Sequence, residues 1–386
     1  MTRYCSIMTQ MLQFFDRTEF DRDVKKTKAE RHARGFSSWD HFVSMLFCQI
    51  SDAQSLREIT GGLASCEGKL EQFGITAPNK STLSYANRNR PWQLFENVFY
   101  NTFQHLQRQL GAQTKFRFKN PVKSIDSSVV TLSAEIFDWA TWSRQKGAVK
   151  LHLMLDHGNY MPEAMVLTTG KYSELTVARR RRYQRGTVLV MDRGFIDFHW
   201  FHQLQNDGVI FVTRMKKETK YEVVESRAVV PNKGVLSDQM IKLTSRKSRK
   251  NYPDQLRLVR FRTKEGEEFD FLTNNTRLAA STIAAIYQDR WQIEVFFKLI
   301  KQNLRIKTFV GTSANAVWTQ IWTAMIGMLL IKFLQLKARA GWSFSNLVAF
   351  LRMNLLVYRD LWQWLDNPFT APPPPPVAKQ LSLELT

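Results

Sequence analysis

Short apolar runs that alternate with polar turns between residues 122 and 213 constrain the fold of this chain more than any other feature. Runs of roughly 4–8 apolar or alternating residues, bounded by turn formers, are typical of β-strands. A helical pattern at 198–204 separates the last two runs. Strands that alternate with a helix predict an α/β sheet of at least five strands. The runs lie at 122–125, 150–156, 163–168, 187–191 and 209–213.

The segments on either side of these strands have other patterns. The first 118 residues repeat apolar side chains at helical spacing. Residues 214–278 are charged and turn-rich and favour short strands, so we interpret them as a β-rich insertion. One helix without Gly or Pro is expected over 279–304, and further helices follow it. We divide the chain into a helical N-terminal domain, a core in two parts around the insertion, and C-terminal helices with a Pro-rich tail: 1–118, 119–213, 214–278, 279–340 and 341–386.

Basic residues outnumber acidic ones throughout the chain. There are 55 Lys and Arg against 34 Asp and Glu, a formal net charge of +21, and the excess is present in 1–120, 121–278 and 279–386 alike. This distribution predicts a large basic surface and a polyanionic partner, of which nucleic acid is the commonest. A content of 44% hydrophobic residues excludes wholesale disorder.

Cysteine content and hydropathy bear on the compartment. The three cysteines have no C-x-x-C spacing, which argues against a disulfide framework or a zinc knuckle and suits a reducing cytoplasm. No signal-peptide pattern is recognised at the N-terminus. The apolar stretch 316–336 is interrupted by Gln320 and Lys332, and a spanning helix needs about 20 apolar residues. We therefore expect a buried helix there and no membrane partner.

The segment from Ser55 to Arg90 has the composition of a helix-turn-helix. A short helix and a turn precede a second helix rich in Lys, Ser, Asn and Arg, which suit base edges and phosphates. The alternative is a solvated helical hairpin with ordinary capping, and the sequence leaves both open. The candidate DNA contacts here are Lys80, Arg88 and Arg90.

Two acidic residues directly follow apolar strands. Asp126 comes after 122–125, and Asp192 comes after 187–191. Functional sites in open α/β sheets form at the carboxyl ends of strands. Each Asp could instead cap a turn, because Asp-Ser-Ser and Asp-Arg-Gly are both good turn sequences.

A third candidate carboxylate lies on the long helix. Tyr287, Arg290, Glu294 and Lys301 follow one another at i, i+3, i+7 and i+14, which places them on one stripe. From periodicity alone this is equally a solvated face. Together, Asp126, Asp192 and Glu294 would supply oxygen ligands for Mg²⁺, and two such ions could act at a phosphodiester.

At these residues the chain resembles the DDE transposases of the insertion sequence 4 family. The resemblance rests on the order Asp126, Asp192, Glu294, on the Tyr-x2-Arg-x3-Glu-x6-Lys spacing, and on Asp192-Arg-Gly-Phe195. It spans about residues 15–307. The family implies a ribonuclease H-like mixed sheet core with an N-terminal all-α DNA-binding domain and a β-rich insertion before the catalytic-Glu helix.

The resemblance also implies a reaction and its residues. Asp126, Asp192 and Glu294 would hold two Mg²⁺ ions, with Mn²⁺ as a substitute. Water would cleave one strand at an inverted-repeat end, the freed 3′-OH would form a hairpin with the opposite strand, and the reopened end would attack target DNA. A homodimeric synaptic complex in the bacterial cytoplasm, associated with the nucleoid, is expected. The implied DNA contacts are Tyr287, Arg290, Trp291, Lys298, Lys301 and Arg193.

One departure concerns base flipping. Relatives can carry a base-stacking Trp in the insertion, but residues 214–278 contain none. Tyr221, Phe261, Phe269 or Phe271 could replace it.

Basic clusters near the candidate site complete the expectation of DNA binding. Arg180 and Arg181 precede the Asp192 strand, and Lys216 and Lys217 open the insertion. Each could neutralise a backbone phosphate, although a single charge run is usually a solvated face. Two other functions stay open: a catalytically inactive, transposase-derived DNA-binding protein, and a structure-selective nuclease on the same fold.

Overall fold

The computed structural model describes residues 5–370 except 32, 67, 112–114, 134, 144–145, 231–232, 305 and 307. The Pro-rich tail lies outside the described residues. The N-terminal part is helical, as expected, and side-chain caps such as the reciprocal Ser37–Asp40 capping box start several of its helices. These helices are α1 (Ile7–Leu12), α2 (Arg17–Thr27), α3 (Ser38–Ser51), α4 (Leu56–Ala64), α5 (Leu70–Phe73), α6 (Lys80–Asn89) and α7 (Gln93–Leu110).

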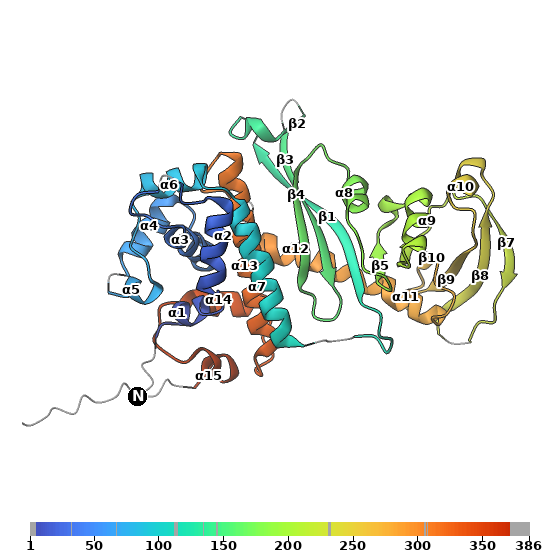
Figure 1. The fold of residues 1–386 in the computed structure, drawn as a ribbon. Coiled ribbons are helices and arrows are strands. Elements are labelled where there is room, and N and C mark those ends of the chain that lie inside the picture. Colours follow the sequence, from blue (N-terminus) through green and yellow to red (C-terminus); the bar gives the residue numbers. More distant parts are fainter. Residues whose placement is uncertain are drawn as a thin grey trace, which may run out of the picture.

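One mixed sheet, of ten strands among the described residues, runs from the middle of the molecule to the end opposite the N-terminal helices (Figure 1), which confirms the α/β class. Its order is β2-β3-β1-β5-β6-β10-β9-β8-β7, and β4 pairs with β3. The β1–β5 and β5–β6 pairs are parallel, and the pairs flanking them are antiparallel. The strands are β1 (Val122–Ser133), β2 (Thr141–Ser143), β3 (Lys146–Asp156), β4 (Pro162–Thr169), β5 (Val188–Met191), β6 (Ile210–Arg214), β7 (Tyr221–Ser226), β8 (Val235–Leu243), β9 (Leu256–Arg262) and β10 (Glu268–Thr273).

Residues 214–278 extend this sheet rather than forming a separate unit. Strand β10 pairs with β6, and β9, β8 and β7 follow in turn. Strand β8 was not expected, because its Ser-Asp-Gln centre interrupts the apolar pattern. The buried Asp238 in that centre is tolerated because Arg257 on β9 pairs with both of its oxygens, at 2.8 and 2.7 Å.

Helices cover both faces of the sheet. The later helices are α8 (Glu174–Arg180), α9 (Phe198–Asn206), α10 (Arg246–Asn251), α11 (Ala280–Asp289), α12 (Trp291–Asn303), α13 (Ala314–Lys337), α14 (Phe344–Asn354) and α15 (Leu361–Asp366). Apolar residues of α9 pack with β5 and β6 on one face, and those of α11 pack with the same strands on the other. The central strands are therefore buried on both sides, which explains their continuous apolar runs.

The helix expected over 279–304 is two helices that meet at Arg290. The N–H of Arg290 donates to the carbonyl of Tyr287, and that of Ile293 donates to the carbonyl of Arg290, so the hydrogen bonds tighten to i→i+3 for one turn. Neither Gly nor Pro marks this position, so the sequence pattern could not predict it.

A third core joins the two ends of the chain. Helix α13 packs against α7 and α3, and α12, α14 and α15 belong to the same cluster (Figure 1). Among the described residues, α13 is the one helix long and apolar enough to cross a membrane, and 89% of its most apolar window is buried inside the protein.

Candidate active site

The two strand aspartates lie side by side. Ile125 on β1 and Met191 on β5 are register partners in the parallel pair, and Asp126 and Asp192 are the residues that directly follow them. Asp192 follows the end of β5, as expected. Asp126 does not end its strand, because β1 continues to Ser133 in antiparallel pairing with β3. It lies where the pairing with β5 stops, which is why both aspartates still reach the same edge.

The helix stripe faces these aspartates. The Tyr287 hydroxyl donates to Asp192 Oδ1 at 3.4 Å. Arg290 Nη1 lies 3.5 Å from Asp126 Oδ2, and Arg290 Nη2 lies 2.6 Å from Glu294 Oε1. The Arg290 side chain is only 12% exposed, so this part of the stripe is not a solvated face. A single guanidinium thereby links the β1 carboxylate to the helix carboxylate.

The electrostatic state of the site follows from burial. Burial raises the pKa of Asp126 to about 6, the Ser127 N–H and Arg290 oppose that rise, and the charges of Glu174 and Glu294 add to it. Burial likewise raises the pKa of Tyr287 to about 12, so its hydroxyl is a neutral donor near pH 7. Asp126 is therefore a carboxylate with too little positive charge around it, which an added cation would stabilise.

The donor set suits a hard divalent cation, since all three candidate ligands are carboxylates. Within the described part of the chain, no three acidic, histidine or cysteine side chains are close enough to form a metal cage. Arg290 pairs with both Asp126 and Glu294 instead. The chemistry of the ligands and the pKa of Asp126 fit a cation, and Arg290 supplies the positive charge in this arrangement.

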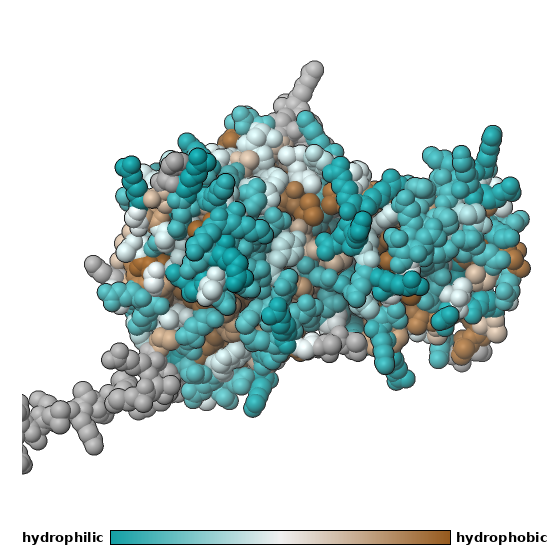
Figure 2. Space-filling view, viewed as in Figure 1, coloured by the Kyte–Doolittle hydropathy of each residue, from teal (hydrophilic) through white to brown (hydrophobic). Residues whose placement is uncertain are grey.

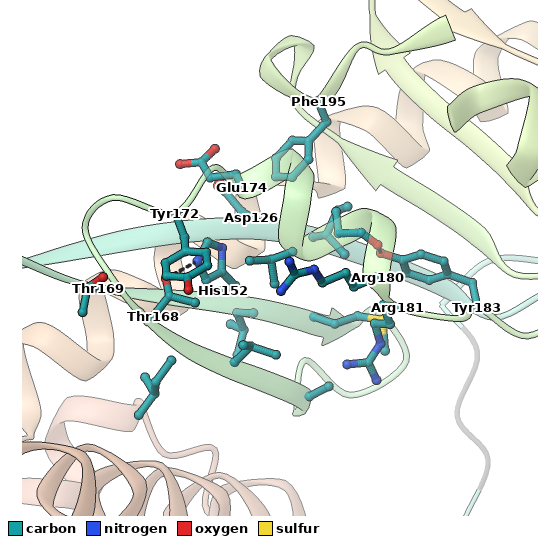
Figure 3. A pocket seen from close by; sticks show the side chains of 18 of the residues that line it. Asp126, His152, Thr168, Thr169, Tyr172, Glu174, Arg180, Arg181, Tyr183 and Phe195 are labelled. Atoms are coloured by element: carbon teal, nitrogen blue, oxygen red, sulfur yellow. Dashed lines mark hydrogen bonds between the residues drawn. The ribbon is translucent and has the colours of Figure 1, made fainter. Parts of the chain in front are cut away.

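A cavity of about 660 Å³ opens beside Asp126 (Figure 3). Its floor is apolar, from β1, β3 and β4, and Glu174, Arg180 and Arg181 of the α8 segment reach it. The Ser127 hydroxyl donates to Glu174, which keeps this carboxylate near Asp126. Glu174 was not predicted, because nothing in its local sequence distinguishes it from a solvated acidic residue.

The remaining residues predicted to contact DNA differ in how exposed they are. Trp291 is 59% exposed, and Lys298, Arg193, Lys216 and Lys217 are also exposed. Lys301 instead donates to the carbonyl of Val129 on β1 at 3.0 Å, which ties α12 to the sheet. None of the four aromatic candidates for base stacking is exposed: Tyr221, Phe261 and Phe269 are half-buried and Phe271 is buried.

Helix α6 presents two of its three predicted contacts. Lys80 and Arg88 are exposed. Arg90 is largely buried: its guanidinium donates to the carbonyls of Phe36 and Ser37 and lies 5.1 Å from the Phe36 ring centroid. This side chain therefore joins the end of α6 to the start of α3, and a DNA contact at Arg90 stays a prediction.

A basic groove of about 760 Å³ runs along α6. Lys28, Arg31 and Arg34 line one side, and Tyr85, which is 67% exposed, projects from the helix. The sequence did not single out these four residues, because the groove forms only when the segment 28–36 packs against α6. Hydrophilic side chains cover most of the molecular face in Figure 2, over the N-terminal helices and over the β7–β10 end.

Comparisons with known proteins identify a family and several relatives of this chain. Residues 117–330 match the family described as Transposase DDE domain, and residues 4–76 match a domain of unknown function, DUF4372. A Sinorhizobium fredii protein named as transposase y4zB is 30% identical over 80% of this chain and 85% of its own. A Geobacillus stearothermophilus protein named as transposase for insertion sequence element IS5377 is 28% identical over 72% of this chain and 74% of its own. InsG, the Escherichia coli transposase for IS4, is 24% identical over 49% of this chain and 44% of its own.

Proposed function

The chain belongs to the DDE transposases, of the insertion sequence 4 type, and we propose that it moves its element by cut-and-paste transposition with Asp126, Asp192 and Glu294 as the metal ligands. As a member of this family it is an enzyme of DNA transposition that uses divalent metal ions. The proposal adds the identity of the ligands, two Mg²⁺ ions that Mn²⁺ can replace, and the hairpin route.

This proposal depends on the close placement of three segments that are far apart in the sequence. Asp126 on β1 and Asp192 after β5 lie at the same level of two adjacent strands, and Arg290 links Asp126 to Glu294. The strand order β4-β3-β1-β5-β6 supports a ribonuclease H-like core. Bound metal ions would activate the attacking oxygen and stabilise the leaving one.

The chain's own side chains have separate tasks. Tyr287 orients Asp192 through its hydroxyl. Arg290 holds Glu294 toward Asp126, and its buried Nε has no hydrogen-bond partner among the described residues. Arg180 and Arg181 lie where a strand entering the cavity would pass, and exposed Trp291 offers a stacking surface for an unstacked base.

The groove along α6 is the proposed binding surface for the inverted repeat. Its Lys28, Arg31 and Arg34 offer three cations beside a helix with short polar side chains, and that helix also carries the exposed Arg88. A homodimer would bring two such ends together, and the protein would act in the bacterial cytoplasm at the nucleoid.

The first prediction tests the three carboxylates. Asp126→Asn, Asp192→Asn and Glu294→Gln each remove one negative charge without changing shape. We expect each to abolish strand cleavage, by about 10³-fold or more, because each removes a metal ligand. The measurement is cleavage of labelled element-end DNA, sized on denaturing gels, with Mg²⁺, with Mn²⁺ and with chelator.

The control is Asp270→Asn on β10, whose carboxylate pairs with exposed Arg260 and not with a residue of the site, and it should cleave normally. Full cleavage by any of the three variants would overturn the ligand assignment. Wild-type protein that binds ends but never cuts them would instead be an inactive DNA-binding descendant. Cleavage without hairpin formation or joining would identify a structure-selective nuclease.

A further inference from the structure

One buried carboxylate beside Arg290 receives an unusual number of donors. Asp289 accepts a hydrogen bond from His157 Nδ1 at 2.6 Å, one from the Tyr160 hydroxyl that is shared between both carboxylate oxygens at 3.1 and 3.2 Å, and one from Lys115 Nζ. On the other side of its ring, His157 Nε2 is hydrogen-bonded to the Ser124 hydroxyl. Ser124 is 0%, His157 1% and Asp289 8% exposed.

These residues join segments that are far apart in the sequence. Ser124 lies on β1, and Asp289 ends α11. His157 begins the turn after β3, whose backbone is fixed by a hydrogen bond from the His157 N–H to the Val122 carbonyl and by Tyr160 in the left-handed region at φ 56°. The contact of this turn with the helix junction was not predicted.

A Ser-His-Asp chain also suggests a hydrolytic triad, and the burial argues against one. A nucleophilic hydroxyl must reach a substrate carbonyl. Ser124 has no exposed surface and lies inside the sheet, while Asp289 is shared among three donors. The arrangement can hold the two elements together, but it cannot attack a substrate.

The place of the Ser124–His157–Asp289 link along β1 brings it next to the candidate active site. Ser124 and Asp126 are two residues apart, so they lie on the same face of β1. Asp289 and Arg290 are consecutive in the helix pair. The link from Ser124 through His157 to Asp289 therefore lies next to the ion pair of Asp126 with Arg290, and both connect the same strand to the same helix junction.

We propose that Ser124, His157 and Asp289 form a positioning chain that fixes the α11–α12 junction, and through it the placement of Arg290 and Glu294 against Asp126. This proposal rests on the proposed function, because it assigns these three residues a task in the same site. The i→i+3 hydrogen bonds at Arg290 make the junction the least regular point of the helix pair. A misplacement of about 1 Å can slow a reaction by about 100-fold, so a clamp at this point matters.

The experiment compares Asp289→Asn, His157→Gln and Ser124→Ala with wild type and with Asp270→Asn. Single-turnover cleavage of element-end DNA, end binding in chelator, melting temperature and amide hydrogen exchange of residues 286–296 in metal-free protein are measured. We expect Asp289→Asn to slow cleavage by about 100-fold and His157→Gln by about 10-fold, with faster exchange at 290–294. Ser124→Ala should have the smallest effect. End affinity should stay within about twofold, because none of these residues reaches the surface used by DNA.

Three results would overturn the proposal: wild-type cleavage by Asp289→Asn and His157→Gln, unchanged exchange at 290–294, or a loss of end binding and melting temperature that accompanies the loss of cleavage in all three variants. In the last case the Ser124–His157–Asp289 link would stabilise the whole fold rather than the α11–α12 junction. Asp126→Asn is measured in parallel. If it also cleaves normally, the proposed function has failed; if it is inactive while Asp289→Asn is normal, only the positioning chain has failed.

Discussion

Two arginines in α6 and at its end show how little sequence position says about a single side chain. Arg88 and Arg90 both belong to a basic, polar stretch typical of a recognition helix. Arg88 is exposed, whereas Arg90 is 8% exposed and donates to two backbone carbonyls. A fork of donors can serve a phosphate or a pair of carbonyls equally well, so only the packing of the segment 28–36 decides between the roles.

This contrast yields a matched pair of predictions. Arg88→Ala should weaken end binding and reduce the slope of log affinity against log salt by about 1, as expected for one lost phosphate contact, without a change in stability. Arg90→Met should destabilise the protein by about 2 kcal/mol, since it leaves the Phe36 carbonyl without its donor, whereas the Ser37 carbonyl keeps the His41 N–H. Urea unfolding and fluorescence anisotropy at several salt concentrations measure the two effects. An Arg90 variant that folds normally but loses end affinity would contradict this assignment.

At the scale of elements, the β7–β10 half of the sheet depends on one buried ion pair. Arg257 on β9 pairs with Asp238 on β8 and also donates to the carbonyls of Asn275 and Leu278, at 3.1 and 2.6 Å. These contacts hold β8, β9 and the chain entering α11 in fixed relation. Helix α11, which leads to Arg290 and then to Glu294 on α12, thus begins from a segment anchored by Arg257.

Arg257→Met should therefore destabilise the protein by about 3–5 kcal/mol, because it leaves Asp238 buried without its partner. The matched control is Arg260→Met on the same strand. Its ion pair with Asp270 is partly exposed, with side chains 46% and 30% accessible, so about 1 kcal/mol or less is expected. Urea midpoints for the two variants test this difference, and equal destabilisation would contradict it.

Elements with a strong local pattern could be predicted from the sequence, and elements defined by distant partners could not. The runs predicted at 163–168, 187–191 and 209–213 lie within about one residue of β4, β5 and β6, and burial on both faces gives β5 and β6 their continuous signal. Strand β3 was predicted from residue 150, but it begins at Lys146. Strand β8 was missed because its buried Asp238 looks polar until Arg257 is placed beside it. The helix break at Arg290 was missed for a similar reason, since no residue there disfavours a helix.

The residues of the candidate site also divide into those that the sequence could predict and those that it could not. Asp126, Asp192 and Glu294 could be named because strand ends and a spaced helical motif are local features. Glu174 and Asp289 carry no such mark. Their importance arises from the Ser127 hydroxyl in one case and from His157 in the other, and both partners are distant in the chain.

At the scale of the whole molecule, the first and last helices share one core. Helix α13 packs against α7 and α3, and the N–H groups of Ile7 and Met8 donate to the carbonyls of Val357 and Leu355 at 3.1 and 2.9 Å. The N-terminal segment that carries the α6 groove is thus completed by residues beyond the catalytic helix. The five segments read from the sequence are divisions of the chain, and helices from three of them, 1–118, 279–340 and 341–386, share one core.

This shared core predicts that residues 1–118 will not fold alone. Expressed as a fragment, they would expose the apolar faces of α3 and α7 that α13 covers, so we expect no cooperative melting transition. In the full chain, helical circular dichroism and tryptophan fluorescence should melt together. A fragment that melts cooperatively and binds element ends with full affinity would show that the N-terminal helices are independent.

The register of β1 against β5 has a consequence for how copies of the mobile DNA element lose activity. Asp126 and Asp192 meet because Ile125 and Met191 are partners. Loss of one codon inside β1 before Asp126 would keep the reading frame and nearly all of the apolar composition, yet it would turn every following side chain of the strand to the opposite face. A gene carrying that three-nucleotide deletion would still encode a full-length protein with all three carboxylates, and the mobile element would nevertheless be silent.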